Sequence, residues 1–475
     1  MINFQVISGG NNEAAAGQAA DYPEEKREKH TARDGSEYET GYFSENGGAP
    51  SQWLGAGAQA QGLEGRVSRE DLIDGYLGRA KDQTGAIVAE TGNRGGKKAE
   101  DERRYAMDLA LSAPKSVSLL ALVGGDERLL QAHNLANAVA MAWAEKNMVY
   151  ARIGKGGEGS EFTGNAIIAS YTHETARTVG GIADPQLHTH NLLMNLTQRA
   201  DGTWVGARLD FGKNNEKFKV LDSIYKAELA RLVRAAGYEI EFTADGFEIR
   251  GISREVIEAF SGRKNQIDEA LGEHGLTRET ATARQRDNAN LATRGKKSQL
   301  SDIDQKYEWR ERAQEEGLDL QSMQEKSREN AEKQQAQPSD QQRPPITGED
   351  AVKSALHHLS ERDTLFSETA LLDESLKAGL GEVSYQDVQK AIKDRAGGLV
   401  SAGEVDRGEG KTEPLFTTRA AIFREAEILH RAKNGQGKTE AIIAIDKEIQ
   451  KVVPDVSFTE QEINDGKRSY SSRDA

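Results

Sequence analysis

Apolar runs and amphipathic stretches alternate along the first 300 residues of the chain. Continuous apolar runs at 105–111, 166–172 and 192–197 are typical of buried strands. Apolar residues at helical spacing over 126–147 and 215–236 predict two long amphipathic helices between and after these strands. We therefore expect one continuous unit of strands and helices that ends near residue 300.

The pattern changes beyond that unit. The stretch 314–345 is rich in Gln, Glu, Ser and Lys and ends in several prolines, which is typical of a helix that passes into a linker. After Ile346 the apolar spacing becomes helical again, in the segments 348–359, 367–378, 385–396 and 418–433. The prediction is three parts: residues 1–300, a polar helix and linker over 301–345, and a smaller, mostly helical region over 346–475.

Composition narrows the class of protein. With 36% hydrophobic residues among 475, the chain can build at least one sizeable core. No stretch approaches the roughly 18 apolar residues of a membrane span, and the first residues lack the basic start and apolar centre of a secretory signal. The absence of cysteine excludes disulfides and thiolate metal sites. We expect a cytoplasmic protein without membrane insertion.

The formal charge of −15 is unevenly spread. Residues 1–300 hold 37 Lys/Arg against 42 Asp/Glu, whereas residues 301–475 hold 25 against 35, so the C-terminal part contributes −10 of the total. A basic stretch interrupts this acidic background, and its members are Arg284, Arg286, Arg294, Lys296 and Lys297, with Asp287 as the only acid. Such a run is a candidate for phosphate contact, although a solvated helix face is the commoner explanation.

Three of the nine histidines fall within eighteen residues, at His173, His188 and His190. Side chains two apart on a strand point to the same face, so His188 and His190 would lie together. Apolar runs before His173 and after His190, with a Gly/Asp/Pro turn between them, predict two neighbouring antiparallel strands that bring His173 beside the pair. Three imidazoles suit Zn, Mn, Ni, Cu or Fe, and also Mg when phosphate oxygens complete the shell.

A metal-polarised substrate needs a nucleophile, and the chain offers neither cysteine nor a G-x-S-x-G serine elbow. Tyrosines cluster instead near the N-terminus, at Tyr22, Tyr38 and Tyr42. A phenol is a poor nucleophile at its ordinary pKa, so it needs a metal or a positive field beside it. A phosphate-loop-like match at Gly437-Lys438-Thr439 is rejected, because a helix precedes it where the nucleotide site requires a buried strand.

Seven separated segments, in order, resemble the MobF class of conjugative relaxases, plasmid-transfer nickases in which a relaxase domain precedes a helicase. The segments are Ala19-Ala-Asp-Tyr22; Trp53-Leu-Gly-Ala-Gly57 with Gln61-Gly-Leu-Glu-Gly65; Asp108-Leu-Ala-Leu-Ser-Ala-Pro-Lys-Ser-Val-Ser118; Thr163-Gly-Asn165; His173-Glu-Thr-Ala-Arg177; Asp184-Pro-Gln-Leu-His-Thr-His190 with Asn195; and Ala259-Phe-Ser-Gly-Arg263. The resemblance covers residues 1–300 most specifically. Residues 346–463 resemble the helical lead-in to the helicase, without its ATPase motor.

The resemblance implies an α+β, HUH-type endonuclease fold, in which a central antiparallel sheet carries the histidines and helices flank it. It also implies that His173, His188 and His190 bind a divalent ion, left open among Mg, Mn, Zn and Ni, that polarises the scissile phosphate. Tyr22 would form a 5′-phosphotyrosyl bond with one DNA strand, and Asp108 would orient a ligating histidine or assist the tyrosine.

One departure from the family leaves the number of catalytic tyrosines open. Family members commonly carry adjacent tyrosines, whereas Tyr22 is followed by Pro23 and Tyr42 by Phe43. Tyr22 is the first choice for the nucleophile, Tyr42 a second candidate and Tyr38 a weaker one.

The implied partners are single-stranded DNA and a hairpin at a transfer origin, with conjugation accessory proteins and a type IV secretion coupling protein. Arg263, Lys264 and the basic stretch 284–297 are the candidate DNA contacts. A rolling-circle replication or transposition nuclease, a small-molecule hydrolase and an inactive DNA-binding remnant are the competing functions. The Ser-Ala-Pro-Lys-Ser-Val-Ser match argues against the first, and the absence of eight βα units argues against the second.

Overall fold

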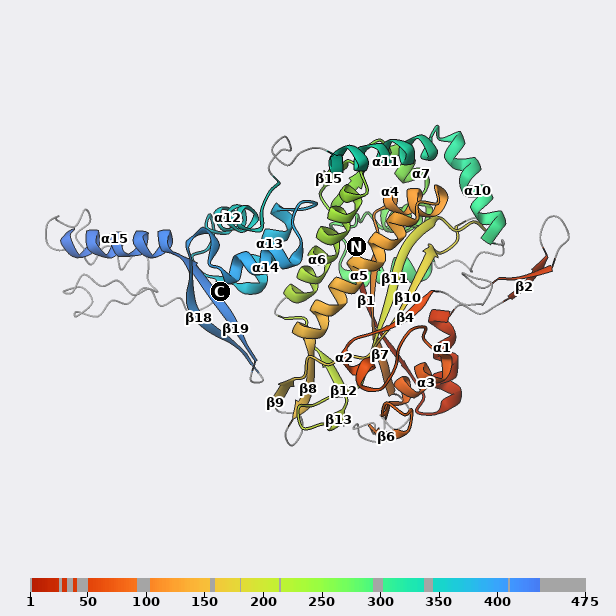
Figure 1. Ribbon diagram of the computed structural model, residues 1–475, viewed down its shortest axis with the longest axis horizontal. Helices are drawn as coiled ribbons and strands as arrows, with labels where there is room; N and C mark the ends of the chain where they lie inside the picture. Colours follow the sequence, from red (N-terminus) through yellow and green to blue (C-terminus); the bar gives the residue numbers. More distant parts are fainter. Residues whose placement is uncertain are drawn as a thin grey trace.

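A five-stranded antiparallel sheet forms the centre of the molecule (Figure 1), and its strand order is β1-β7-β11-β10-β4. The computed structural model describes residues 2–24, 28–31, 37–40, 50–91, 103–153, 159–179, 181–212, 215–293, 302–336, 345–408 and 411–435. The strands of the sheet are β1 (Ile2–Gly9), β7 (Arg103–Ser112), β11 (Pro185–Met194), β10 (Ile168–Thr175) and β4 (Ser51–Leu54). The runs predicted at 105–111 and 166–172 fall within or overlap β7 and β10, and 192–197 overlaps the end of β11.

Helices cover both faces of this sheet. The remaining elements of the first 300 residues are α1 (Glu13–Glu24), β2 (Glu28–Thr31), β3 (Glu37–Thr40), α2 (Ala56–Ala60), α3 (Arg69–Leu77), β5 (Arg79–Lys81), β6 (Ile87–Glu90), α4 (Lys115–Ser118), a π-helical turn (Leu119–Val123), α5 (Glu127–Met148), β8 (Val149–Ile153), β9 (Gly159–Phe162), β12 (Thr197–Gln198), β13 (Trp204–Val205), β14 (Ala207–Leu209), α6 (Glu216–Ala235), β15 (Ile240–Thr243), β16 (Gly246–Ile249), α7 (Arg254–Ala259), α8 (Gly262–Gly272) and α9 (Ala283–Ala292). The smaller strands pair as β14-β8-β9 and as two-stranded ribbons.

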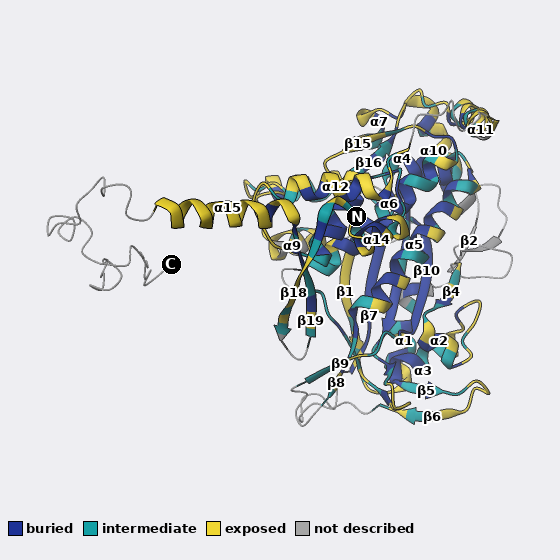
Figure 2. Cartoon of the chain, turned by 60° about the vertical axis from the view of Figure 1, so that its left-hand side comes forward, coloured by how far each residue is buried: buried dark blue, intermediate teal, exposed yellow. Residues whose placement is uncertain are grey.

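Alternation along the strands separates two cores (Figure 2). Leu109, Leu111 and Leu193 belong to one apolar cluster with α5 and α6, whereas Ala106, Ala169 and Leu192 belong to a second with α1 and α3. Since successive strand residues face opposite sides, each strand buries apolar groups on both faces. The side chains at 108, 173, 188 and 190 share the register of the second cluster, so they face the helices α1 and α3.

Two further helices, α10 (Asp302–Glu315) and α11 (Leu320–Ala336), pack back onto this unit. The indole N–H of Trp309 donates to the carbonyl of Ala183 at 2.7 Å, and its ring is 2% exposed. On the next turn Arg312 pairs with Asp184 at 2.6 Å and lies over the ring of Phe260. The boundary at residue 300 stays a prediction, because α10 shares the main apolar core.

We expect Trp309→Ala to lower the free energy of unfolding by about 3–5 kcal/mol, since truncating a buried tryptophan leaves a cavity. Urea unfolding followed by circular dichroism measures this change. Tyr307→Ala, on the same helix with a 55% exposed side chain, is the matched control and should change stability little. Equal losses in both variants would show that Trp309 is not an anchor for α10.

The C-terminal part combines helices with a small sheet. Its elements are α12 (Gly348–Leu359), β17 (Phe366–Ser367), α13 (Glu368–Ala378), α14 (Tyr385–Lys393), a 3-10 turn (Ala396–Gly398), β18 (Leu399–Gly408), β19 (Lys411–Thr418) and α15 (Arg419–Gly435). The predicted helices correspond to α12 to α15, while the three strands β17 to β19 were not predicted. The part packs through α13 onto α6, and α15 projects away from it (Figure 1). None of the helices in the described ranges is both long and apolar enough to cross a membrane.

Candidate metal centre

Three histidines meet where β10 and β11 run side by side on the face of the sheet that α1 covers. The antiparallel register sets His173 opposite His188, as the sequence predicted, and His190 follows two residues later on the same face. The three ring centroids lie 5.0–5.3 Å apart, and one ligand nitrogen from each ring falls within 4.8 Å of the others. Among the described residues this is the only group of three or more His, Cys, Asp or Glu placed to hold a metal ion.

Each of the three rings also contacts a fixed oxygen. Nδ1 of His188 donates to the carbonyl of Gln186 at 2.8 Å, and Nδ1 of His190 lies 2.7 Å from Oδ2 of Asp108. Nε2 of His173 donates to the carbonyl of Pro23 at 3.0 Å. Ligating imidazoles characteristically donate their second N–H to a carbonyl or carboxylate, which fixes the ring and its tautomer. The donor set and its surroundings therefore fit a divalent ion.

Burial keeps these rings in the form that binds metal. Burial first, and the neighbouring His190 and His173 next, hold the pKa of His188 well below its usual range. The ring is consequently neutral at physiological pH, and a metal does not have to displace a proton from an imidazolium.

Asp108, on the neighbouring strand β7, is 1% exposed and faces the same side. Its Oδ2 accepts from both the His190 ring and Nε2 of Gln5, the latter at 3.1 Å. Its Oδ1 is buried and has no hydrogen-bond partner among the described residues. Asp108 is therefore placed to orient His190, with one acceptor atom left over inside the site.

We expect Asp108→Asn to weaken divalent-metal binding by about 10–100-fold, because the charge that polarises the His190 ring is lost. Isothermal titration of Mn²⁺ into the protein measures the change. Asp201→Asn, at a 53% exposed carboxylate on the surface, is the matched control. Unchanged Mn²⁺ affinity in Asp108→Asn would mean that the carboxylate does not act on the metal centre.

A polar layer on the other face of the sheet holds the histidine strand in place. Thr189 donates or accepts a 2.7 Å bond with Nε2 of His133, whose Nδ1 meets the Tyr225 hydroxyl at 2.7 Å. Asn191 exchanges bonds with Asn137 of α5. Burial lowers the pKa of His133 to about 3, so this ring is a neutral structural bridge between α5, α6 and β11.

The beginning of β11 is fixed by a buried lysine from the Ser-Ala-Pro-Lys segment. Nζ of Lys115 donates to the carbonyl of Pro185 at 2.8 Å. Burial, only partly offset by Asp184 and Glu248, lowers the pKa of Lys115 to about 8. Gly262 at the start of α8 donates its N–H to Asp184 next to this strand end, at 2.7 Å. The strand that carries two histidines is thus anchored at its first residue.

The helix α1, which includes position 22, packs over the same face of the sheet. Its Ala16 and Ala20 are fully buried in the second apolar cluster. Arg69 of α3 pairs with Asp21 at 2.7 Å and donates to the carbonyl of Gly17 at 2.7 Å. With the His173–Pro23 bond, these contacts hold the last turns of α1 from two sides.

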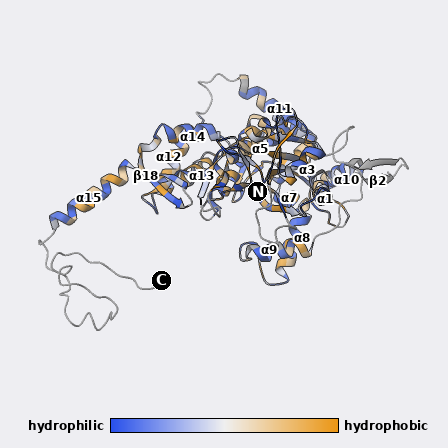
Figure 3. Cartoon of the chain, turned by 90° about the horizontal axis from the view of Figure 1, so that it is seen from below, coloured by the Kyte–Doolittle hydropathy of each residue, from blue (hydrophilic) through white to orange (hydrophobic). Residues whose placement is uncertain are grey.

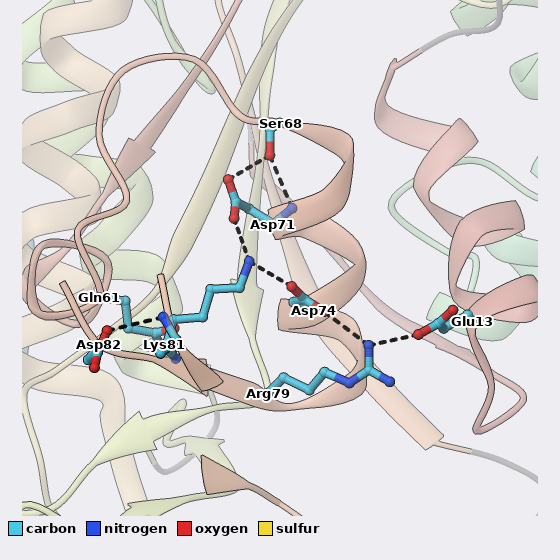
Figure 4. A network of polar contacts seen from close by, with 9 residues as sticks. Glu13, Gln61, Ser68, Asp71, Asp74, Arg79, Lys81 and Asp82 are labelled. Atoms are coloured by element: carbon cyan, nitrogen blue, oxygen red, sulfur yellow. Dashed lines mark hydrogen bonds and ion pairs between the residues drawn. The ribbon is translucent and has the colours of Figure 1, made fainter. Parts of the chain in front are cut away.

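An ion-pair network beside α3 adds a third tie to α1 (Figure 4). Arg79 of β5 pairs with Glu13 of α1 at 2.9 Å and with Asp74 of α3 at 3.1 Å. Lys81 bridges Asp74 and Asp71 at 2.6 and 2.8 Å. The first turn of α1 is therefore connected to α3 through β5.

The tyrosines are only partly covered by the structure. The backbone at Tyr22 belongs to α1 and that at Tyr38 to β3, which pairs with β2, while the side chains of both lie outside the described residues. Tyr42 lies outside the described residues altogether. The assignment of the nucleophile stays a prediction.

The predicted DNA contacts fall on α8 and α9, which extend from the rest of the molecule in the view of Figure 3. Arg263 joins the two helices, because its guanidinium donates to the carbonyls of Thr293 and Asn290, both at 2.6 Å. Lys264, Arg284 and Arg286 are exposed, and Arg294, Lys296 and Lys297 lie outside the described residues. The structure gives Arg263 a structural role and leaves the other described cations accessible.

Sequence reasoning missed three groups of the site: Gln5, the Pro23 carbonyl and the Gln186 carbonyl. Gln5 meets Asp108 only because β1 pairs with β7 across about a hundred residues of sequence. The two carbonyls carry no side-chain signal at all. Only the alternation of polar positions in 2–9 could have hinted at Gln5.

Comparison with known proteins places the site in a family context. The TrwC relaxase family model matches residues 16–316. The multifunctional conjugation protein TraI of Escherichia coli is 31% identical over 85% of this chain, and TraI of strain K12 is 30% identical over 75%. The chain spans about a fifth of these relatives, 22% and 20% of their lengths.

Solved structures show the same likeness. A copper-bound structure of the conjugative relaxase TrwC with oriT DNA has a TM-score of 0.55 and 32% identity, covering 67% of this chain and all of that one. A TrwC complex with a 27-mer DNA that comprises the recognition hairpin and the cleavage site has a TM-score of 0.54 and 29% identity, with the same coverage.

Proposed function

Because the chain belongs to the TrwC relaxase family, we propose that it is a DNA nickase and strand transferase that starts conjugative plasmid transfer. The reaction is site- and strand-specific and leaves the protein covalently joined to the 5′ end of one strand. The observation that carries this proposal is the histidine triad on the sheet face that α1 covers, with His173 bonded to the residue that follows Tyr22.

Tyr22 is the proposed nucleophile. Its phenolic oxygen attacks the scissile phosphorus, the bond to the 3′ oxygen breaks, and a 5′-phosphotyrosyl bond forms while the 3′ end leaves as a hydroxyl. The exchange conserves one phosphodiester for another, so nicking and religation need no ATP. The ties of α1 to α3 and to His173 hold the backbone at Tyr22 at the site.

His173, His188 and His190 would hold the divalent ion, which supplies positive charge to the scissile phosphate. Asp108 keeps the His190 ring oriented through the 2.7 Å contact. An all-nitrogen donor set leaves Mg, Mn, Zn and Ni as candidates for the physiological ion. The copper in the TrwC structure shows that this family's site accepts a soft divalent metal as well.

The proposed substrate is single-stranded DNA next to a hairpin at a transfer origin, as in the TrwC complexes. Lys264, Arg284 and Arg286 are the accessible cations proposed to contact its phosphates, together with Arg294, Lys296 and Lys297. Conjugation accessory proteins and a secretion coupling protein are the further proposed partners, in the cytoplasm. We retain the division into a relaxase part, a linker and a helicase-like lead-in as part of the proposal.

The experiment that tests this function incubates the protein with a labelled oligonucleotide that contains its own transfer origin, with and without EDTA. We expect an adduct that resists denaturation, that forms with Mg²⁺ or Mn²⁺ and that disappears with EDTA. The absence of any adduct with the correct sequence would contradict the proposal and favour a DNA-binding remnant. A scrambled oligonucleotide of the same composition is the control for sequence specificity.

A further inference from the structure

The C-terminal part has the topology of a winged helix. Its elements follow the order α12, β17, α13, α14, β18, β19, and the sheet order is β17-β19-β18. A short strand between the first two helices and a terminal hairpin that returns beside it define this arrangement. From this topology and the surface described below, we infer that residues 345–418 form a second nucleic-acid site, in which the face of α14 binds duplex DNA.

Helices α13 and α14 form the helix-turn-helix of this unit. The turn over 379–384 contains Gly381 with φ 80°, a backbone conformation that favours glycine, and buries Val383. Val388, Ala391 and Ile392 turn one side of α14 into the core between α12 and α13. In helix-turn-helix proteins the second helix enters the major groove with its outer side.

The outer side of α14 carries the groups that read DNA. Gln386, Gln389, Lys390 and Lys393 are all exposed, and no large apolar side chain accompanies them. Glutamine amides pair with adenine edges, while lysines pair with guanine edges or phosphates. The carboxylate on this side, Asp387, accepts from the Ser384 hydroxyl and N–H in a capping box and so belongs to the helix start.

An open groove of about 810 Å³ runs beside this side of α14, between it and α12. Its cations are Lys353, Lys390, Arg395 and Arg419, and its carboxylates are Glu349, Asp387 and Asp394. With Lys393 the surface has five cations against three carboxylates, and Glu349 is already paired with Lys353 at 2.7 Å. The local charge is therefore positive within a part of the chain that is acidic overall, which suits a phosphate backbone.

The hairpin of the unit is occupied by contacts within the molecule. Arg407 lies 3.4 Å from Glu216, and Lys411 lies 3.5 Å from Asp210 and over the ring of Tyr150. The N–H of Tyr385 also donates to Glu228 of α6 at 2.8 Å. These contacts fix the unit on α6, so α14 and the groove are the surface left for DNA, at a set position relative to the histidine site.

The test measures binding of a fluorescein-labelled blunt DNA duplex to the full chain by anisotropy at several salt concentrations. We expect Lys390→Ala combined with Lys393→Ala to weaken binding by about tenfold and to reduce the salt slope by about two. Lys326→Ala combined with Lys333→Ala, at two exposed lysines on α11, removes the same charge and should have little effect. Circular dichroism melting of each variant verifies its fold.

A second readout uses the absence of cysteine from the chain. Gln389→Cys and Lys333→Cys each provide a single thiol for an iron-EDTA reagent. We expect the label at position 389, and not that at 333, to cut the bound duplex in a confined window. Unchanged affinity in the α14 variant, or no cutting above the 333 control, would overturn the proposal and leave the face to a protein partner. The assay scores duplex binding, so it stays decisive if the nicking activity proposed above fails.

Discussion

Tyr22→Phe is expected to abolish formation of the covalent protein–DNA adduct, with a loss of at least about a thousandfold in rate. Phenylalanine keeps the ring but removes the only oxygen that could bond to phosphorus at this position. The contacts that fix α1, through Ala16, Ala20 and Arg69, do not involve the phenol and should persist. Denaturing gel electrophoresis of the labelled oligonucleotide measures the adduct directly.

Tyr38→Phe is the matched control, because it removes a hydroxyl from the β2–β3 ribbon. This variant should form the adduct at close to the normal rate. An adduct of normal yield in Tyr22→Phe would identify another nucleophile, and Tyr42→Phe would then be the next variant to measure. Loss of single-strand binding in Tyr22→Phe would instead point to a defect in the site's structure.

The histidine arrangement could be predicted because its determinants are local. His188 and His190 are two residues apart on a strand, and the turn between β10 and β11 is short enough for the sequence to show both strands and the connection. Alternation then requires that the two side chains share a face. The position of Asp108 on the next strand was harder to predict, and the resemblance to relaxases supplied it.

The remainder of the site depends on pairings that the sequence does not encode locally. β1 joins β7 across about a hundred residues, and this pairing alone brings Gln5 to Asp108. The His173–Pro23 bond spans 150 residues and uses a backbone carbonyl. In the C-terminal part, the strands β17 to β19 are short or rich in charged residues, so their periodicity was weaker than that of the helices around them.

These non-local contacts give the fold its functional logic. One face of the sheet presents His173, His188, His190 and Asp108 to α1, and the other face locks the same strands to α5 and α6 through His133, Thr189 and Asn191. A neutral, fully bonded layer behind the ligands restrains the strands without adding charge near the metal. Rigid ligands and a separately tied helix then meet at a single site.

His188→Ala is expected to lower the affinity for Mn²⁺ by more than the roughly 10–100-fold that follows loss of a ligand's hydrogen-bond partner. The variant removes one of three nitrogens from a set in which each ring is already oriented, so the remaining pair cannot complete the site. Adduct formation should fall in parallel, because less charge then reaches the scissile phosphate. Titration calorimetry and the adduct assay together measure both effects.

His357→Ala is the matched control for this change. Its imidazole lies on α12 and is 85% exposed, so its removal should alter neither metal affinity nor adduct yield. Excess Mn²⁺ should restore part of the activity of His188→Ala if weakened metal binding is the cause of its loss. Full activity of His188→Ala in the presence of EDTA would show that the three histidines do not form the metal centre of this enzyme.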